Sequence, residues 1–121
     1  MSARRILVVD DDEGMVSTLS DILELRGWEA VRAYDGSAAI ELAAKRDVDL
    51  VLMDVRMGMV DGFDALKEIR REEPSAKVIL MSALATFEMA AEARAAGALA
   101  LIRKPLDLPD LFDMLDTVVP T

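Results

Sequence analysis

The stretch Ile6-Leu7-Val8-Val9-Asp10-Asp11-Asp12-Glu13 passes abruptly from four apolar residues to four acidic ones. A short β-branched run without polar alternation is typical of a strand that is buried on both faces of a parallel sheet. The acidic residues indicate a loop, and apolar residues then recur at helical spacing from Met15 to Leu23, with Gly27 as the expected stop. This stretch therefore predicts a strand, an acidic loop and a helix in succession.

Four further segments repeat this order of strand and helix. The strands are expected at residues 28–33, 49–53, 77–81 and 99–103, and the helices at 37–46, about 63–69, 86–96 and 108–118. The strand at 28–33 is the weakest of the five, and the others are mostly apolar instead of alternating. The five units therefore predict an α/β fold, a single doubly wound parallel sheet with helices on both faces. Right-handed crossovers favour the flavodoxin-like strand order 2-1-3-4-5 for five such strands.

The composition excludes several classes of chemistry. Among the 121 residues there is no histidine and no cysteine, so Ser/His triads, histidine metal sites, thiol nucleophiles and disulfides are ruled out. The 14 basic against 23 acidic residues give a net charge of −9, which argues against direct binding of nucleic acid. No apolar run approaches the roughly 18 residues of a membrane span, so we expect a cytoplasmic protein without membrane contact.

The polar residues that follow the strands are expected at one edge of the sheet, where ligands bind in this architecture. They are Asp10 and Asp11 after the first strand, Asp54 after the third, Ser82 after the fourth and Lys104 after the fifth. Carboxylates on neighbouring strands repel one another unless a cation joins them, and Mg²⁺, with Mn²⁺ as a substitute, suits such oxygen ligands. A hydroxyl and an ammonium are donors for phosphoryl oxygens, so the set predicts a site for phosphoryl transfer.

From Ile6 to about Val119, the sequence resembles the receiver domain of two-component response regulators. The motifs that carry the resemblance come in the family's order and at five-strand spacing: Asp10-Asp11, Asp54 followed by Asp61-Gly62, Ser82-Ala83 and Lys104-Pro105. The resemblance implies one receiver domain over residues 1–121, with a core of about 5–119 and no output domain. It also implies a signalling switch that catalyses at most its own phosphorylation and autodephosphorylation.

The same resemblance implies a role for each site residue. Asp54 accepts a phosphoryl group from the histidine of a sensor kinase or phosphotransfer protein. Asp11, Asp54 and the backbone carbonyl of Arg56 hold Mg²⁺, while Asp10 acts mostly through water. Ser82 and Lys104 each bind a phosphoryl oxygen, and the Lys104–Pro105 bond is expected to be cis. A downstream effector, or a missing C-terminal output domain, would bind the face made by the fourth helix, fifth strand and fifth helix. A homodimer is a further alternative.

Two positions depart from the family pattern. The switch position, three residues before the lysine, is usually aromatic and is Leu101 here, so the output is either coupled without an aromatic ring or attenuated. Gly58 stands where the family usually has proline, so we expect a more mobile loop beside the metal site. The methionines are expected mostly in the core, and exposed contacts with a partner are the alternative for Met57 and Met59 in the same loop.

Two other functions stay open at this stage. A pseudo-receiver, an adaptor that works without phosphorylation, is compatible with Leu101. A phosphohydrolase of the haloacid dehalogenase type also uses carboxylates, Lys, Ser/Thr and Mg²⁺, and Asp10-Asp11-Asp12 contains its Asp-x-Asp pattern. The phosphohydrolase is disfavoured because no cap segment is present. Turnover of a generic phosphatase substrate would distinguish it from a switch.

Overall fold

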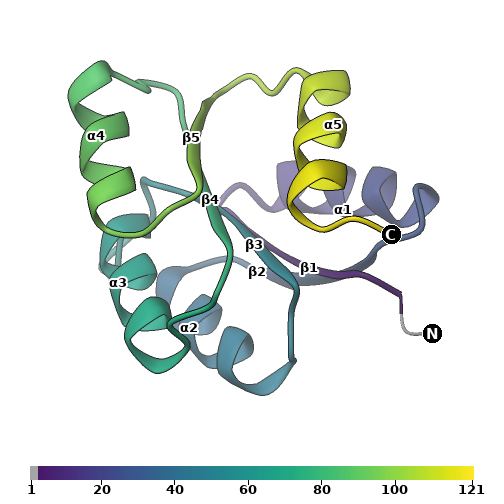
Figure 1. Ribbon diagram of the computed structural model, residues 1–121, viewed down its shortest axis with the longest axis horizontal. Coiled ribbons are helices and arrows are strands. Elements are labelled where there is room, and N and C mark those ends of the chain that lie inside the picture. The colour runs from purple at the N-terminus through teal and green to yellow at the C-terminus, as the bar shows by residue number, and fades with distance from the viewer. Residues whose placement is uncertain (1–2) are drawn as a thin grey trace.

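Strands and helices alternate along the whole chain (Figure 1). The structure is a computed structural model, and it describes residues 3–121. The strands are β1 (Arg5–Val9), β2 (Glu29–Ala33), β3 (Leu50–Asp54), β4 (Val78–Ser82) and β5 (Ala100–Arg103). The helices are α1 (Glu13–Leu25), α2 (Gly36–Lys45), α3 (Gly62–Glu72), α4 (Phe87–Ala95) and α5 (Leu108–Val118). All strands pair in parallel in the order β2-β1-β3-β4-β5, which confirms the predicted fold class.

The helices cover both faces of the sheet, with α1 and α5 on one side and α2, α3 and α4 on the other (Figure 1). Successive strand side chains point to opposite faces, so each strand supplies both layers. In β1, Ile6 and Val8 join the apolar cluster under α1 and α5, while Leu7 and Val9 join the cluster under the other three helices. This double burial explains why β1, β3 and β4 are continuous apolar runs.

Every helix begins at a residue whose side chain accepts a hydrogen bond from the backbone N–H three positions on. These capping residues are Asp12, Asp35, Asp61, Thr86 and Asp107. Each satisfies a helix N–H that would otherwise have no partner. Four of the acidic residues at the carboxyl edge of the sheet are therefore used as caps, which separates them from the acids that can bind a ligand.

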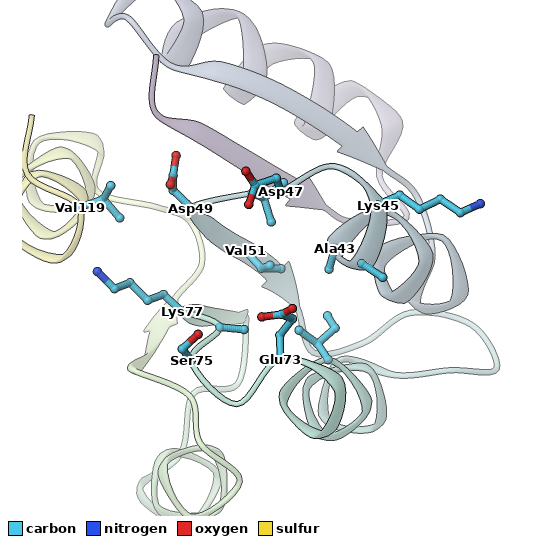
Figure 2. Close-up of a pocket in the computed structure, with 13 residues that line it drawn as sticks. Ala43, Lys45, Asp47, Asp49, Val51, Glu73, Ser75, Lys77 and Val119 are labelled. Carbon is cyan, nitrogen blue, oxygen red and sulfur yellow. The ribbon is translucent and has the colours of Figure 1, made fainter. Parts of the chain in front are cut away.

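The opposite edge of the sheet contains a cavity of about 350 Å³, shown in Figure 2. Two of its charged residues already serve to join elements. Asp49 Oδ2 accepts a 2.7 Å hydrogen bond from Arg5 N, and Lys77 Nζ donates a 2.6 Å hydrogen bond to Val118 O at the end of α5. None of the predicted site residues lines this cavity. In residues 3–121, no helix combines the length and apolarity needed to cross a bilayer.

Candidate metal centre at the carboxyl edge of the sheet

Three carboxylates meet where β1 and β3 end. Val9 of β1 and Met53 of β3 are partners in the register, so Asp10 and Asp54, which follow them, emerge side by side. Carboxylate oxygens of Asp10, Asp11 and Asp54 all lie within 4.8 Å of one another. Asp10 and Asp54 are buried, whereas Asp11 is exposed. The predicted gathering of these three acids is confirmed, and it leaves one open side from which a cation can enter.

Lys104 reaches this cluster from the far side of β4. Its backbone N–H donates a 3.0 Å hydrogen bond to Ser82 O, and the Lys104–Pro105 bond is cis, as expected. The Nζ atom lies 2.5 Å from Asp10 Oδ2 and 3.3 Å from Asp54 Oδ1. Because β5 is separated from β1 by two strands, a long side chain is needed to span that distance. Lys104 is thus the cation shared by the two buried carboxylates.

The surroundings shift the pKa values of both partners upward. Burial raises the pKa of the Asp54 carboxyl, and the negative charge of Asp10 raises it further, while Lys104 offsets part of this effect. Burial lowers the pKa of the Lys104 ammonium, but its hydrogen bond to Asp10 and the charge of Asp54 outweigh that effect and raise it. The ammonium therefore stays protonated, and one positive charge faces three acids.

The excess negative charge and the oxygen-only donors fit a divalent cation such as Mg²⁺. A pocket of about 500 Å³ opens beside Asp11, and Arg56 lines it together with other residues of the segment between β3 and α3. The structure therefore places Arg56 next to Asp11, while the role of its carbonyl as a ligand stays a prediction. Asp61 also lines this pocket, but its carboxylate caps α3 through Asp64 N at 2.8 Å.

Ser82 is the last residue of β4 and is buried. In the register, Asp54 is the partner of Met81, so Ser82 lies one residue beyond the end of β3. Its Oγ accepts a 3.1 Å hydrogen bond from Leu84 N. Because the oxygen is the acceptor in that bond, the hydroxyl proton remains available to another oxygen.

The two methionines of the loop between β3 and α3 differ in exposure. Met57 is only 3% exposed, so its interpretation as an exposed contact is wrong: the side chain packs into the core under α3. Met59 is fully exposed, as expected. Gly58 has φ +28°, a conformation that proline cannot adopt. Leu101 is half-buried against the same apolar cluster as Met57, with no ring to turn toward Ser82.

Two features of the site were missed by the sequence analysis. One is that Lys104, which was expected to neutralise the acids in part, pairs most closely with Asp10, 94 positions away in the sequence. No local spacing signals such a contact, because it depends on the route of a flexible side chain. The other is Met89 of α4, which lines the pocket beside Asp11. Its place in an alanine-rich helix gave no sign that a side chain packed against the core would also reach this pocket.

Comparison with known proteins identifies relatives over nearly the whole chain. The family model of the response regulator receiver domain matches residues 6–116. The regulatory protein AtoC of Escherichia coli (strain K12) is 45% identical over 107 residues, which cover 88% of this chain but 23% of AtoC. Sporulation initiation phosphotransferase F of Bacillus subtilis (strain 168) is 30% identical over 120 residues, which cover 99% of this chain and 97% of that protein. The chain thus spans about a quarter of AtoC but nearly the full length of the Bacillus protein.

Solved structures with the same fold include a CheX–CheY complex and the chemotaxis protein CheY4. The CheX–CheY–BeF3–Mg²⁺ complex from Borrelia burgdorferi contains a chain that is 29% identical, with a TM-score of 0.89 over 98% of this chain and 90% of that one. CheY4 of Vibrio cholerae is 27% identical, with a TM-score of 0.92 over 98% of this chain and 100% of that one.

Proposed function

Because the chain belongs to the response regulator receiver domain family, we propose that it is a phosphorylation-dependent switch whose phosphoacceptor is Asp54. The observation that carries this proposal is the cluster of Asp10, Asp11 and Asp54 around the shared ammonium of Lys104. Such a cluster stabilises the structure poorly, since three acids face one cation. It suits a site in which a phosphoryl group and a divalent cation enter together.

The chemistry needs a nucleophile, a donor and neutralisation of charge. An Asp54 carboxylate oxygen forms a bond to phosphorus, the bond from phosphorus to the donor imidazole nitrogen breaks, and its electron pair leaves with the imidazole. The chain contains no histidine, so the phosphohistidine must belong to a sensor kinase or phosphotransfer protein. Asp11, Asp54 and the Arg56 carbonyl would hold Mg²⁺ or Mn²⁺, with Asp10 acting through water, and the bound cation would offset the charge of the phosphoryl oxygens.

Ser82 and Lys104 would bind the transferred group. The Ser82 hydroxyl has its proton free, because its oxygen accepts from Leu84 N. When the hydroxyl donates a hydrogen bond to a phosphoryl oxygen, the segment after β4 is drawn toward the site. This segment leads directly into α4. Lys104 would supply a second, charged donor.

The phosphorylated state would be read on the face formed by α4, β5 and α5. Phe87 in the first turn of α4 is 88% exposed, and Leu84 in the preceding segment is also exposed. Large apolar side chains at the surface favour contact with another protein surface. We propose a downstream effector, or an output domain elsewhere in a longer chain, as the partner of this face.

Intact-mass analysis after incubation with Mg²⁺ and a small acyl phosphate tests the proposed function. The parent protein should gain one phosphoryl group, Asp54→Asn should gain none, and Asp113→Asn, an exposed acid on α5, should behave like the parent. The proposal is wrong if the parent gains no mass, or if Asp54→Asn gains as much as the parent does.

An adaptor that works without phosphorylation is the second candidate, and the half-buried Leu101 is the observation that favours it. An aliphatic side chain at this position cannot reorient as an aromatic switch does. Equal binding of an effector by phosphorylated parent protein and by Asp54→Ala would support the adaptor. The phosphohydrolase gains no support, because Asp12, which completes Asp-x-Asp, caps α1 through Met15 N at 3.1 Å.

A further inference from the structure

The segment between β3 and α3, residues 55–61, is held by backbone hydrogen bonds at its two ends, its base, and is exposed at its tip, Met59. At the base, Val55 N donates a 2.9 Å hydrogen bond to Met81 O, and Gly62 N donates a 2.8 Å hydrogen bond to Val55 O. Met57 is buried, whereas Met59 at the tip is fully exposed. The same segment lines the pocket beside Asp11. The position of its base therefore determines where its backbone carbonyls lie relative to the acids.

Gly62 allows the first turn of α3 to lie directly on the backbone of the acceptor residue. A Cβ atom at position 62 would lie 2.4 Å from Asp54 O and 2.8 Å from Val55 Cα. Both neighbours are backbone atoms, which cannot rotate away as a side chain does. Any residue other than glycine here must therefore push α3 away from the end of β3.

Gly36 makes a second close contact, from the first residue of α2. A Cβ atom at position 36 would lie 2.4 Å from Val60 O and 2.7 Å from Val60 Cγ1. The helix is held at this end by Asp35, whose carboxylate accepts a 2.7 Å hydrogen bond from Ala38 N. Thus α2, which contributes no residue to the acid cluster, supports the segment 55–61 from outside.

Space, and not backbone conformation, is what requires glycine at these two positions. Neither Gly36 nor Gly62 has a positive φ, so other residues could adopt their backbone angles. Alanine would even favour the helix in each case. The constraint is the approach of each helix start to the segment 55–61.

We propose that Gly36 and Gly62 are positioning residues for phosphoryl transfer, which fix the segment 55–61, and with it the Arg56 carbonyl, against Asp11 and Asp54. The inference rests on the proposed function. A Cβ atom at 2.4 Å must move to an ordinary contact distance of about 3.3 Å. A side chain at position 36 therefore displaces Val60, and one at position 62 displaces the start of α3, to which the segment is joined, by about 1 Å in each case. A displacement of about 1 Å in a catalytic arrangement can cost about 100-fold in rate.

Three alanine variants test the proposal. Gly36→Ala and Gly62→Ala introduce the two contacts, and Gly14→Ala is the matched control, since it also lies in a first helical turn but its Cβ would meet only Asp12 Oδ1, at 3.5 Å. Mg²⁺ affinity is measured by calorimetry, and phosphorylation by the rate of mass gain. We expect Gly36→Ala and Gly62→Ala to bind Mg²⁺ about tenfold more weakly and to accept phosphoryl about 10- to 100-fold more slowly. Gly14→Ala should match the parent.

Ile6→Val is a second control, which distinguishes a loss of stability from a displacement of the segment 55–61. It lowers stability through a core change in the first half of β1 and does not touch that segment. Its Mg²⁺ affinity should equal that of the parent. If Gly62→Ala does not fold, the proposal is tested with Gly36→Ala alone, because position 36 lies farther from Asp54. Mg²⁺ affinity in Gly36→Ala equal to that in Gly14→Ala would overturn the positioning role alone, provided that the parent is phosphorylated. A parent that takes up no phosphoryl group would overturn the proposed function itself.

Discussion

Replacing the acceptor Asp54 by asparagine should make the metal-free domain more stable. The Asp54 carboxylate is buried beside Asp10 and Asp11, and burial together with Asp10 raises its pKa, so its ionised form costs free energy in the folded state. Asparagine has nearly the same shape without the charge. Its amide oxygen can still accept a hydrogen bond from Lys104.

The magnitude follows from the distances between the charges. At an effective dielectric constant of about 20, two like charges at the upper limit of 4.8 Å for the acid cluster repel by about 3.5 kcal/mol, and opposite charges 3.3 Å apart attract by about 5 kcal/mol. Asp54 has two such acidic neighbours and one cation, so repulsion exceeds attraction by about 2 kcal/mol. Because Asp11 is exposed and its charge is screened by water, we expect a net gain of about 1 kcal/mol, or about 4 °C in Tm.

Denaturant unfolding can be followed through Trp28, the only tryptophan, which is 4% exposed in the fold. Parent and Asp54→Asn are compared in a chelator and again in excess Mg²⁺. We expect the variant to unfold at higher denaturant concentration in the chelator. Mg²⁺ should narrow the difference, since a ligand that binds the folded parent stabilises it.

Asp113→Asn serves as the control, because it removes one negative charge from the exposed surface of α5, outside the cluster. Its stability should stay within about 0.5 kcal/mol of the parent's. If Asp54→Asn is no more stable than the parent in the chelator, the three acids do not repel one another as their distances require, and the reasoning fails.

Three other changes have defined outcomes. Lys104→Met removes the cation shared by Asp10 and Asp54 and should lower stability in a chelator by about 1–3 kcal/mol; unchanged denaturation would contradict the ion pairs. Ser20→Ala in α1 should raise stability by about 1 kcal/mol, because Ser20 Oγ is buried with no hydrogen-bond partner among the described residues; a loss in thermal unfolding would indicate an unseen partner. Gly58→Pro should lower stability by about 1–3 kcal/mol, since φ +28° is closed to proline, and an unchanged Tm would mean that the loop adopts another conformation.

The fold could be predicted because its three central strands, β1, β3 and β4, are buried on both faces. Runs such as residues 50–53 and 78–81 show no alternation, and this is the pattern that only a sheet covered on both sides produces. The observed strands begin and end within about two residues of their expected positions. For Met57, core packing and an exposed contact both stayed open, because an apolar residue in a loop has no periodicity to show whether it faces water or the core.

The site could be predicted only as far as strand order determines it. Parallel pairing brings Asp10 beside Asp54 whatever their side chains do, so their meeting follows from topology. The partner of Lys104 does not follow, because a four-carbon side chain at the end of β5 can reach several acceptors. The two glycine contacts were also hidden: the sequence shows Gly36 and Gly62 at the starts of helices, but not that backbone lies within 3 Å of where a Cβ would be.

The shared ammonium links the resting arrangement to the phosphorylated one. Lys104 Nζ is closer to Asp10, at 2.5 Å, than to Asp54, at 3.3 Å. Within residues 3–121, the only other hydrogen bond that the Asp10 carboxylate accepts comes from Asp12 N, at 3.0 Å. Under the proposed function, a phosphoryl group on Asp54 places new negative oxygens beyond the carboxylate and draws Lys104 toward them. Asp10, which is only 1% exposed, then loses its ion pair with the Lys104 ammonium. Leaving a buried carboxylate unpaired costs free energy. The need for a divalent cation beside Asp10 is therefore greater after transfer than before it. By linkage, the cation that relieves Asp10 favours the phosphorylated state by the same free energy.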